Sequence, residues 1–402
     1  MRRYLLQLGF GVLILLVSAA AFSWAVDPFG YYGGWVIQGF NAVKPAAANY
    51  ANEVKPPLIV ARNPQAVILG NSYSEVGLDP LHPAFVGTFE NTYNFGLRHM
   101  RWRQTLCHYD YVVSRLGSNL KRVLLGVRPI RMEYASCHVE GMPSGDVDHL
   151  KLLLSGTALW QSMRTLLHQD PAAASMTREG RVFHLRTTPG VRERFAKTLN
   201  TRPLCRWDSH TPARVESFVA PEAIPPLPGL THLIKDAIRR GLDLRIVIHP
   251  RHAYFYEKLV QCGGVPEHWK RVWWIAKVVE DAAENARRIP IWYFTPYHEL
   301  LVEPVPRSGH MKYWQDAGHY NYELGDAILD LVYGSRHPDR DNVSALGFQV
   351  STANLVEHYA RVHRERSAFL AANPGFLAEL AELMPPSFPP PSAARASVSM
   401  LR

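Results

Sequence analysis

The sequence predicts a three-layer α/β domain with a mostly parallel β-sheet, preceded by one membrane-spanning helix. Two observations carry this expectation. Short apolar runs alternate with helical segments along most of the 402 residues, and residues 4–26 carry no charge. Strands that alternate with helices form parallel sheets with helices on both faces. The uncharged segment is long enough to cross a hydrocarbon core of about 30 Å.

The domain is expected between residues 65 and 335. Five apolar runs are typical of buried strands, and amphipathic segments between them are typical of helices. The predicted strands are 65–70, 92–95, 121–127, 242–249 and 289–294, and the predicted helices are 102–116, 230–240, 266–288 and 322–332. Residues 131–228 interrupt the alternation and are interpreted as an insertion. Residues 336–384 are expected to form C-terminal helices, and the Pro-rich residues 385–402 a disordered tail.

The N-terminal segment sets the topology. Arg2 and Arg3 precede the apolar residues and are expected to stay in the cytoplasm, which places the domain on the far side of a bacterial cytoplasmic membrane, in the periplasm or outside. Small residues at Ala20, Ala21 and Ala25 leave a cleaved signal peptide as the alternative. The length of the segment favours an uncleaved anchor over 1–26, followed by a linker and domain entry at 27–64.

Charge and cysteine content narrow the classes of partner. The formal net charge of +9 favours anionic partners, and an envelope protein near anionic lipids accounts for it. A nucleic acid is not expected as a partner, because no binding module accompanies the charge. The four cysteines form no CxxC pair, which disfavours a zinc site, and the histidines lack the spacing of a metal site. One or two disulfides and buried free thiols both remain open for Cys107, Cys137, Cys205 and Cys262.

Candidate reactive residues follow the ends of predicted strands, where ligands of open parallel sheets bind. Ser72 comes directly after Gly70, at the start of a predicted helix whose free N–H groups favour a developing oxyanion. A helix cap is the simpler interpretation of a lone serine there. Asp316 and His319 follow the last strand, three residues apart on an expected first helical turn, where the carboxylate can orient the imidazole. Together the three residues predict a nucleophile, a base and an orienting acid at one sheet edge.

This arrangement resembles the SGNH, or GDSL-like, hydrolase family. Gly70-Asn71-Ser72 is similar to the family's first block, Gly96 to its second, and Asp316-x-x-His319 to its last. The resemblance implies a flavodoxin-like sheet and a Ser72–His319–Asp316 triad, with the backbone amides of Ser72 and Gly96 as oxyanion donors. The third block departs from the family pattern: Gly126-Val127-Arg128-Pro129 stands where an asparagine is usual. Arg128 is the expected substitute for that donor.

The anchor and the divergent block resemble the subgroup that O-acetylates exopolysaccharides and other envelope polymers. The resemblance implies an O-acetyltransferase or acetylesterase that needs no metal or organic cofactor. Its expected partners are an acylated carbohydrate or polysaccharide, the membrane through residues 4–26, and a membrane protein that donates acyl groups. Asn71, His249 and Arg251 are expected to contact substrate. The alternative is an inactive protein of the same fold that binds glycan or a membrane partner.

Overall fold

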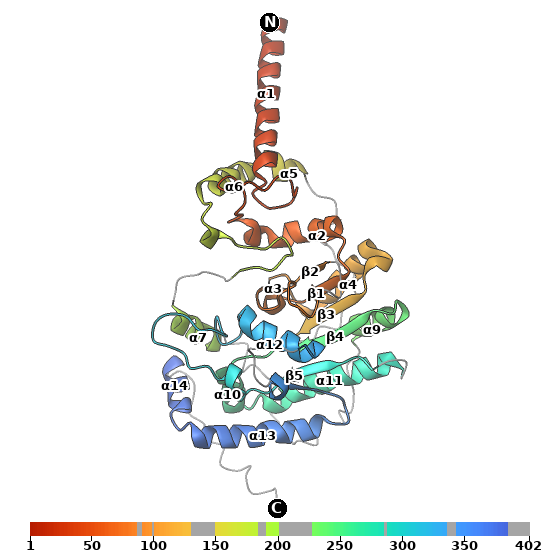
Figure 1. The fold of residues 1–402 in the computed structure, drawn as a ribbon, viewed down its shortest axis with the longest axis vertical. Helices are drawn as coiled ribbons and strands as arrows, with labels where there is room; N and C mark the ends of the chain where they lie inside the picture. The colour runs from red at the N-terminus through yellow and green to blue at the C-terminus, as the bar shows by residue number, and fades with distance from the viewer. Residues whose placement is uncertain are drawn as a thin grey trace, which may run out of the picture.

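A computed structural model gives the fold and describes residues 1–86, 91–98, 100–129, 149–183, 190–200, 227–284, 288–335 and 343–384. Helices surround a central β-sheet, and α1 projects from one end (Figure 1). The strands are β1 (Ala66–Leu69), β2 (Thr92–Asn94), β3 (Arg122–Val127), β4 (Asp243–Ile248), β5 (Ile291–Phe294) and β6 (Gly347–Gln349). The α-helices are α1 (Arg2–Val26), α2 (Ala51–Arg62), α3 (Ser72–Gly77), α4 (Trp102–Leu116), α5 (His149–Leu154), α6 (Gly156–Leu167), α7 (Val191–Leu199), α9 (Pro228–Arg239), α10 (Ala253–Gln261), α11 (Val265–Ala283), α12 (Tyr322–Tyr333), α13 (Leu355–Ala372) and α14 (Phe376–Leu383). Short 3₁₀ turns are η1 (Ala47–Tyr50), η2 (Gly117–Asn119), η3 (Pro171–Ala173), η5 (Glu299–Leu301) and η6 (Val343–Ala345).

The sheet has the strand order β2-β1-β3-β4-β5-β6. The first five strands pair in parallel, and β6 adds an antiparallel edge strand to β5. The predicted alternation of strands and helices is therefore confirmed for a mostly parallel sheet. β6 comes from residues 336–384, where only helices were expected, so the sheet extends beyond residue 335. A strand of three residues is too short to leave a period-2 pattern.

Alternate strand residues enter two separate apolar cores, which makes the fold three-layered. Val67, Val123 and Ile246 face a core formed with α2, α4, α9 and α11. Ile68, Leu124 and Val247 face a second core formed with α3, α7, α12 and α14. Because both faces are covered, the strands are apolar at nearly every position, as buried parallel strands are.

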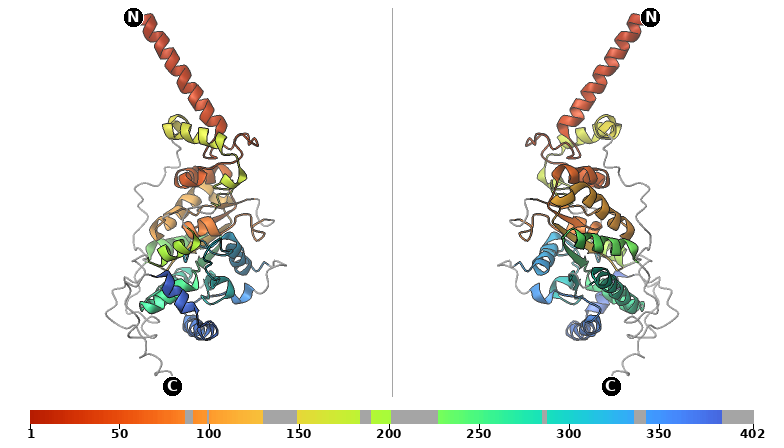
Figure 2. Two further views of the ribbon diagram at one scale, coloured as in Figure 1. Left: turned by 90° about the vertical axis from the view of Figure 1, so that its left-hand side faces the viewer. Right: turned by 90° about the vertical axis from the view of Figure 1, so that its right-hand side faces the viewer.

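The region interpreted as an insertion contains α5, α6 and α7 among its described residues. The first two pack against α1 rather than against the sheet. In the two side views of Figure 2 they lie across the base of α1. The insertion thus builds part of the connection between the N-terminal helix and the domain.

The end of α1 is built into the domain. Ser23 and Val26 are fully buried, and the side chains of Asn41 and Lys44 donate hydrogen bonds to the carbonyl oxygens of Ala25 and Val26 at 3.0 and 2.8 Å. The rest of α1 stands free, and the helix is long and apolar enough to span a membrane. Cleavage after Ala25 would remove the buried Ser23 from this junction, whereas cleavage after Ala21 would leave both Ser23 and Val26 in place.

Two of the four cysteines lie in the described part of the chain. Cys107 and Cys262 are both disulfide-bonded, so the free-thiol alternative does not hold for them. Cys137 and Cys205 lie outside the described residues. Disulfides persist in oxidising compartments such as the bacterial periplasm.

Candidate active site

Ser72 is the first residue of α3, directly after β1. Gly70 makes this turn possible: its φ is +152°, and a Cβ there would overlap the Ser74 hydroxyl. Asn71 is the N-cap of α3, and its side-chain oxygen accepts a hydrogen bond from the Tyr73 amide at 3.1 Å. The capping role therefore belongs to Asn71, not to Ser72. Asn71 is buried and committed to the helix, which argues against the substrate contact expected of it.

Ser72, His319 and Asp316 form a continuous hydrogen-bonded chain. Ser72 Oγ lies 2.9 Å from His319 Nε2, and His319 Nδ1 lies 2.9 Å from Asp316 Oδ2. These distances let Nδ1–H donate to the carboxylate while Nε2 accepts the serine proton. Ser72 is half-buried, and the side chains of His319 and Asp316 are 23% and 17% exposed to solvent. The three residues thus have the hydrogen-bonded arrangement that an activated serine needs, and solvent can reach them.

The Asp316–His319 segment is a tight loop and not the helical turn that was expected. A β-bridge between Trp314 and Tyr320 closes the loop, and α12 begins only at Tyr322. Asp316 Oδ1 accepts the amides of Gly318 and His319 at 2.7 and 2.9 Å. The carboxylate therefore holds both the loop backbone and the imidazole, which fixes the ring orientation more firmly than one contact would.

The pKa values of this pair move apart in the directions that a base and its orienting acid need. Burial alone would lower the pKa of His319, but the Asp316 carboxylate raises it above the ordinary value of 6.5. Burial alone would raise the pKa of Asp316, but the imidazole and its hydrogen bonds lower it below 3.8. Asp316 is consequently ionised when His319 takes up a proton.

The second predicted oxyanion donor, Gly96, is already engaged. Its amide donates to Asn94 Oδ1 at 2.9 Å, and a Cβ there would come within 2.6 Å of the Glu75 backbone nitrogen. The structure thus brings Gly96 against α3 but not as a free donor. The Ser72 amide lies in the first turn of α3, where N–H groups have no partner within the helix.

Two arginines surround the ring of Tyr73, next to Ser72. The Arg128 guanidinium carbon lies 5.1 Å from the Tyr73 ring centroid and that of Arg251 lies 5.6 Å from it. Tyr73 also stacks on His319, with 4.5 Å between ring centroids. Burial lowers the pKa of Arg251 to about 10, and the charge of Arg128 contributes in the same direction. The site therefore contains two positive charges that repel each other beside the triad.

His249 was expected at the rim and is instead buried beneath it. Its Nε2 lies 3.0 Å from Ser74 Oγ and its Nδ1 lies 2.8 Å from the Tyr320 hydroxyl. Burial lowers its pKa to about 3, so it is neutral at ordinary pH. Its burial gives no support to the expected substrate contact, which stays a prediction. His249 instead links α3 to the residue that follows the Asp316–His319 loop.

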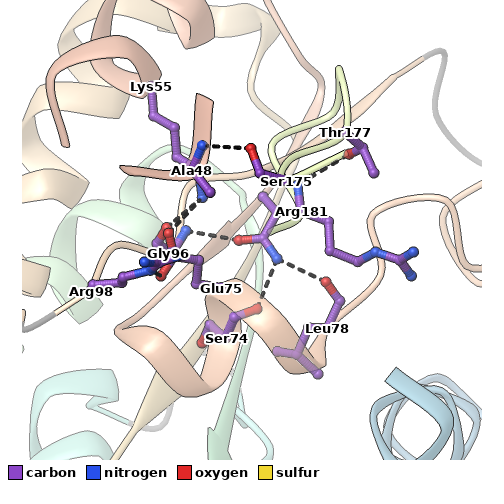
Figure 3. Close-up of polar contacts among 11 residues, drawn as sticks. Ala48, Lys55, Ser74, Glu75, Leu78, Gly96, Arg98, Ser175, Thr177 and Arg181 are labelled. Carbon is purple, nitrogen blue, oxygen red and sulfur yellow. Dashed lines mark hydrogen bonds and ion pairs between the residues drawn. The ribbon is translucent and has the colours of Figure 1, made fainter. Parts of the chain in front are cut away.

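A buried charged cluster behind α3 was missed by sequence reasoning (Figure 3). Lys55 Nζ donates to the Gly96 carbonyl oxygen at 2.6 Å and lies 3.7 Å from Glu75, which Arg98 contacts at 3.3 Å. Burial lowers the pKa of Lys55 to about 8 despite the opposing effect of Glu75. The sequence hint that could have found it is Lys55, a charged residue directly before the apolar stretch 56–61. The cluster attaches α3 to α2 and to the segment after β2.

Two glycines bring α3 against α12. A Cβ on Gly325 of α12 would overlap the carbonyl oxygen of Gly77 at the end of α3, and a Cβ on Gly77 would overlap the Tyr320 ring. Ser72 lies at the other end of α3, and His319 lies just before α12. The close backbone approach therefore sets the spacing between the elements that carry Ser72 and His319.

The chain matches no protein-family model, no curated protein and no solved structure. Within the described residues, groups of three or more His, Cys, Asp and Glu side chains suited to a metal ion are not found.

Proposed function

We propose that this protein is a membrane-anchored serine acyltransferase or esterase that acts on an acylated carbohydrate of the cell envelope. One observation carries the proposal: Ser72, His319 and Asp316, far apart in the sequence, form an ordered chain with both hydrogen bonds at 2.9 Å. A capping serine needs no imidazole partner, and a structural Asp–His pair needs no serine.

In the proposed mechanism, His319 Nε2 takes the Ser72 proton while Oγ bonds to the ester carbonyl carbon. The carbonyl electrons move to oxygen, and the Ser72 amide with Arg128 stabilises that oxyanion. Its collapse breaks the bond to the leaving alcohol, which receives the proton from His319. Water or a carbohydrate hydroxyl then attacks acyl-Ser72 while His319 Nε2 takes the proton of that hydroxyl. The second oxyanion collapses, the bond between the acyl carbon and Ser72 Oγ breaks, and Oγ receives the proton from His319. Asp316 keeps the imidazole oriented and stabilises its charged form. The steps need no metal or organic cofactor.

The proposed fold is flavodoxin-like, and the proposed family is SGNH. The five parallel strands have the order 2-1-3-4-5 of a flavodoxin-like sheet, which supports an SGNH-type domain. The first and last blocks of the SGNH pattern contribute the triad. The second block, at Gly96, supports α3 rather than offering a free amide. An SGNH-type enzyme in this chain would rely on Arg128 and the Ser72 amide more than on Gly96.

The proposed location is the bacterial cytoplasmic membrane, with α1 as a single uncleaved span and the domain in the periplasm. The burial of Ser23 opposes cleavage after Ala25, and the length of α1 favours an uncleaved anchor. Arg2 and Arg3 favour a cytoplasmic N-terminus. The disulfide-bonded Cys107 and Cys262 favour an oxidising compartment for the domain. A membrane partner that supplies acyl groups fits this location.

The substrate is proposed to carry an anionic group near its reacting ester. A transient oxyanion needs only dipoles, whereas Arg128 and Arg251 are permanent charges with no hydrogen bond or ion pair inside the described residues. Asp316, whose charge acts on Arg251, is already bonded to His319 and to two amides. Unpaired guanidinium groups are costly to bury, so a bound carboxylate or phosphate would stabilise them.

Arg251→Gln tests this preference with two acetyl esters of one phenol, 3-acetoxybenzoate and its neutral methyl ester. The variant is expected to lower kcat/KM about 10- to 100-fold for the anionic ester, because one charged hydrogen bond is lost. The neutral ester should change little. Arg239→Gln, an exposed arginine of α9, is the control and should leave both rates unchanged. Equal losses for both esters would contradict an anion-binding role.

The proposed function is tested by a fluorophosphonate probe on the full chain in detergent. Wild type is expected to be labelled covalently, and Ser72→Ala and His319→Ala should lose the label, because only an activated serine reacts. Ser114→Ala, which removes an exposed serine hydroxyl on α4, is the matched control and should label like wild type. Labelling that survives in Ser72→Ala would overturn the proposal.

The alternative is a catalytically inactive envelope protein that keeps the fold and binds glycan. The missing third-block asparagine favours it, and the closed Ser72–His319 distance opposes it. A folded wild type that resists the probe but binds an acylated oligosaccharide would favour this alternative.

A further inference from the structure

An apolar surface surrounds the base of α1 and has no counterpart elsewhere in the described residues. It consists of large exposed side chains on the loop after α1 and on α5 and α6, here named the apolar collar: Trp35, Val36, Ile37, Leu150, Trp160, Met163 and Leu167. These side chains make up more than half of the large apolar side chains that the described residues expose outside residues 1–26. A soluble domain rarely gathers such residues on one surface without a partner.

The side chains of α6 are inverted relative to a helix on a water-soluble surface. Ala158, Ser162 and Thr165 are fully buried, whereas Trp160 and Leu167 are 62% and 78% exposed. Small and hydroxyl side chains thus face the protein while large apolar ones face outward. Helices packed in lipid follow this rule, with small residues between helices and large apolar residues toward the acyl chains.

The collar is continuous with the proposed membrane span. Both α5 and α6 contact α1 and lie across its base (Figures 1 and 2). Asn41 attaches the loop by donating to the carbonyl oxygens of Ala25 and Trp35 at 3.0 and 2.9 Å. With its 25 residues, α1 is about 37 Å long and exceeds a hydrocarbon core of about 30 Å. Its last turns therefore reach the interface, at the level where the collar lies.

The charges beside the collar suit a bilayer surface. Residues 149–168 contain Lys151 and Arg164, both exposed, and no Asp or Glu. A basic edge beside Trp and Leu is typical of helices that lie in the headgroup region of anionic membranes. Lysine and arginine can extend toward the headgroups while the apolar side chains enter the acyl region.

We propose that the apolar collar lies in the outer interface of the membrane that α1 spans, so that α5 and α6 hold the catalytic domain against the bilayer in one orientation. The occupant of this surface is lipid. The inference goes beyond acyl transfer and rests on the insertion of α1, which is part of the proposed function.

The test places an environment-sensitive NBD label at Leu167→Cys in the full chain, reconstituted in vesicles of phosphatidylcholine and phosphatidylglycerol. Lipids with a nitroxide near the headgroup act as quenchers. In vesicles that contain the quencher lipids, the label is expected to lose most of its fluorescence. In vesicles without quencher, its emission should lie at shorter wavelength than that of the same label in buffer without lipid or detergent. Leu377→Cys on α14, which lies at the opposite end of the domain, is the matched control and should be unaffected. The wild-type chain, treated with the same label, shows how much label the native cysteines take up.

A label at Leu13→Cys separates failure of this inference from failure of the anchor. If Leu13 is quenched by lipids with a deep nitroxide and Leu167 behaves like Leu377, the span stands and the collar proposal is overturned. If neither is quenched, the membrane insertion itself fails. Energy transfer between Leu167 labels on different copies, without quenching by lipid, would identify a second copy as the occupant and would also overturn the proposal.

Discussion

Asp316→Asn is expected to slow fluorophosphonate labelling of Ser72 by about three to four orders of magnitude, because an asparagine cannot hold the imidazole in the basic tautomer. The acid limb of the pH profile should shift as well. In wild type the carboxylate raises the pKa of His319 above 6.5, so labelling falls as the pH drops through a value above 6.5. Without the carboxylate, burial dominates and the midpoint should move below 6.5.

The measurement is the second-order labelling rate between pH 5 and 9, compared with Asp281→Asn. Asp281 is an exposed aspartate on α11, and its side chain pairs with Lys277 of the same helix. That control should match wild type in rate and in midpoint. A normal rate with an unshifted acid limb in Asp316→Asn would show that His319 does not act as a base oriented by Asp316.

Gly325→Ala is expected to destabilise the protein by at least about 3 kcal/mol, because the new Cβ would overlap the backbone of Gly77 and backbone atoms cannot rotate away. Glycine to alanine within a helix is ordinarily stabilising by about 0.5–1 kcal/mol, so the sign itself is diagnostic. The variant should also separate Ser72 from His319. The free energy of unfolding from a denaturant titration and the labelling rate are the two readouts.

Gly156→Ala is the matched control for this experiment. It lies at the start of α6, and a Cβ there would meet no atom within 4 Å. Its stability should stay within about 0.5 kcal/mol of wild type and its labelling rate should not change. A Gly325→Ala variant as stable and as reactive as wild type would contradict the spacing role of the two glycines.

The sheet could be predicted from sequence because its strands are buried on both faces. Apolar runs such as 123–127 and 246–248 mark such strands directly. Helix α2 could not be predicted, because Pro56 and Pro57 in its middle normally end a helix. Burial of Val54 and Leu58 against the core outweighs that cost. Local preference was overridden by packing that only the tertiary fold provides.

The convergence of Ser72, His319 and Asp316 could be predicted because strand ends meet at one sheet edge, whichever local structure carries Asp316 and His319. Their loop could not be predicted, since it depends on the bridge between Trp314 and Tyr320. The burial of His249 could not be predicted either, for a related reason. A residue directly after a strand can point into the layer below as well as toward the site. The His249 ring occupies the space that a side chain at Gly126 would fill.

The Ser72–His319 hydrogen bond joins residues separated by 247 positions. During synthesis the N-terminal segment and Ser72 emerge early, whereas the base emerges only after most of the chain has followed. A contact across such a distance forms late, because a long loop must close before it can be made. In the proposed mechanism, Ser72 therefore has no base until the domain is complete. Under the proposed function and location, with export from the N-terminus, Ser72 would acquire its base only after the domain has left the cytoplasm, and acyl esters on the inner side would be spared.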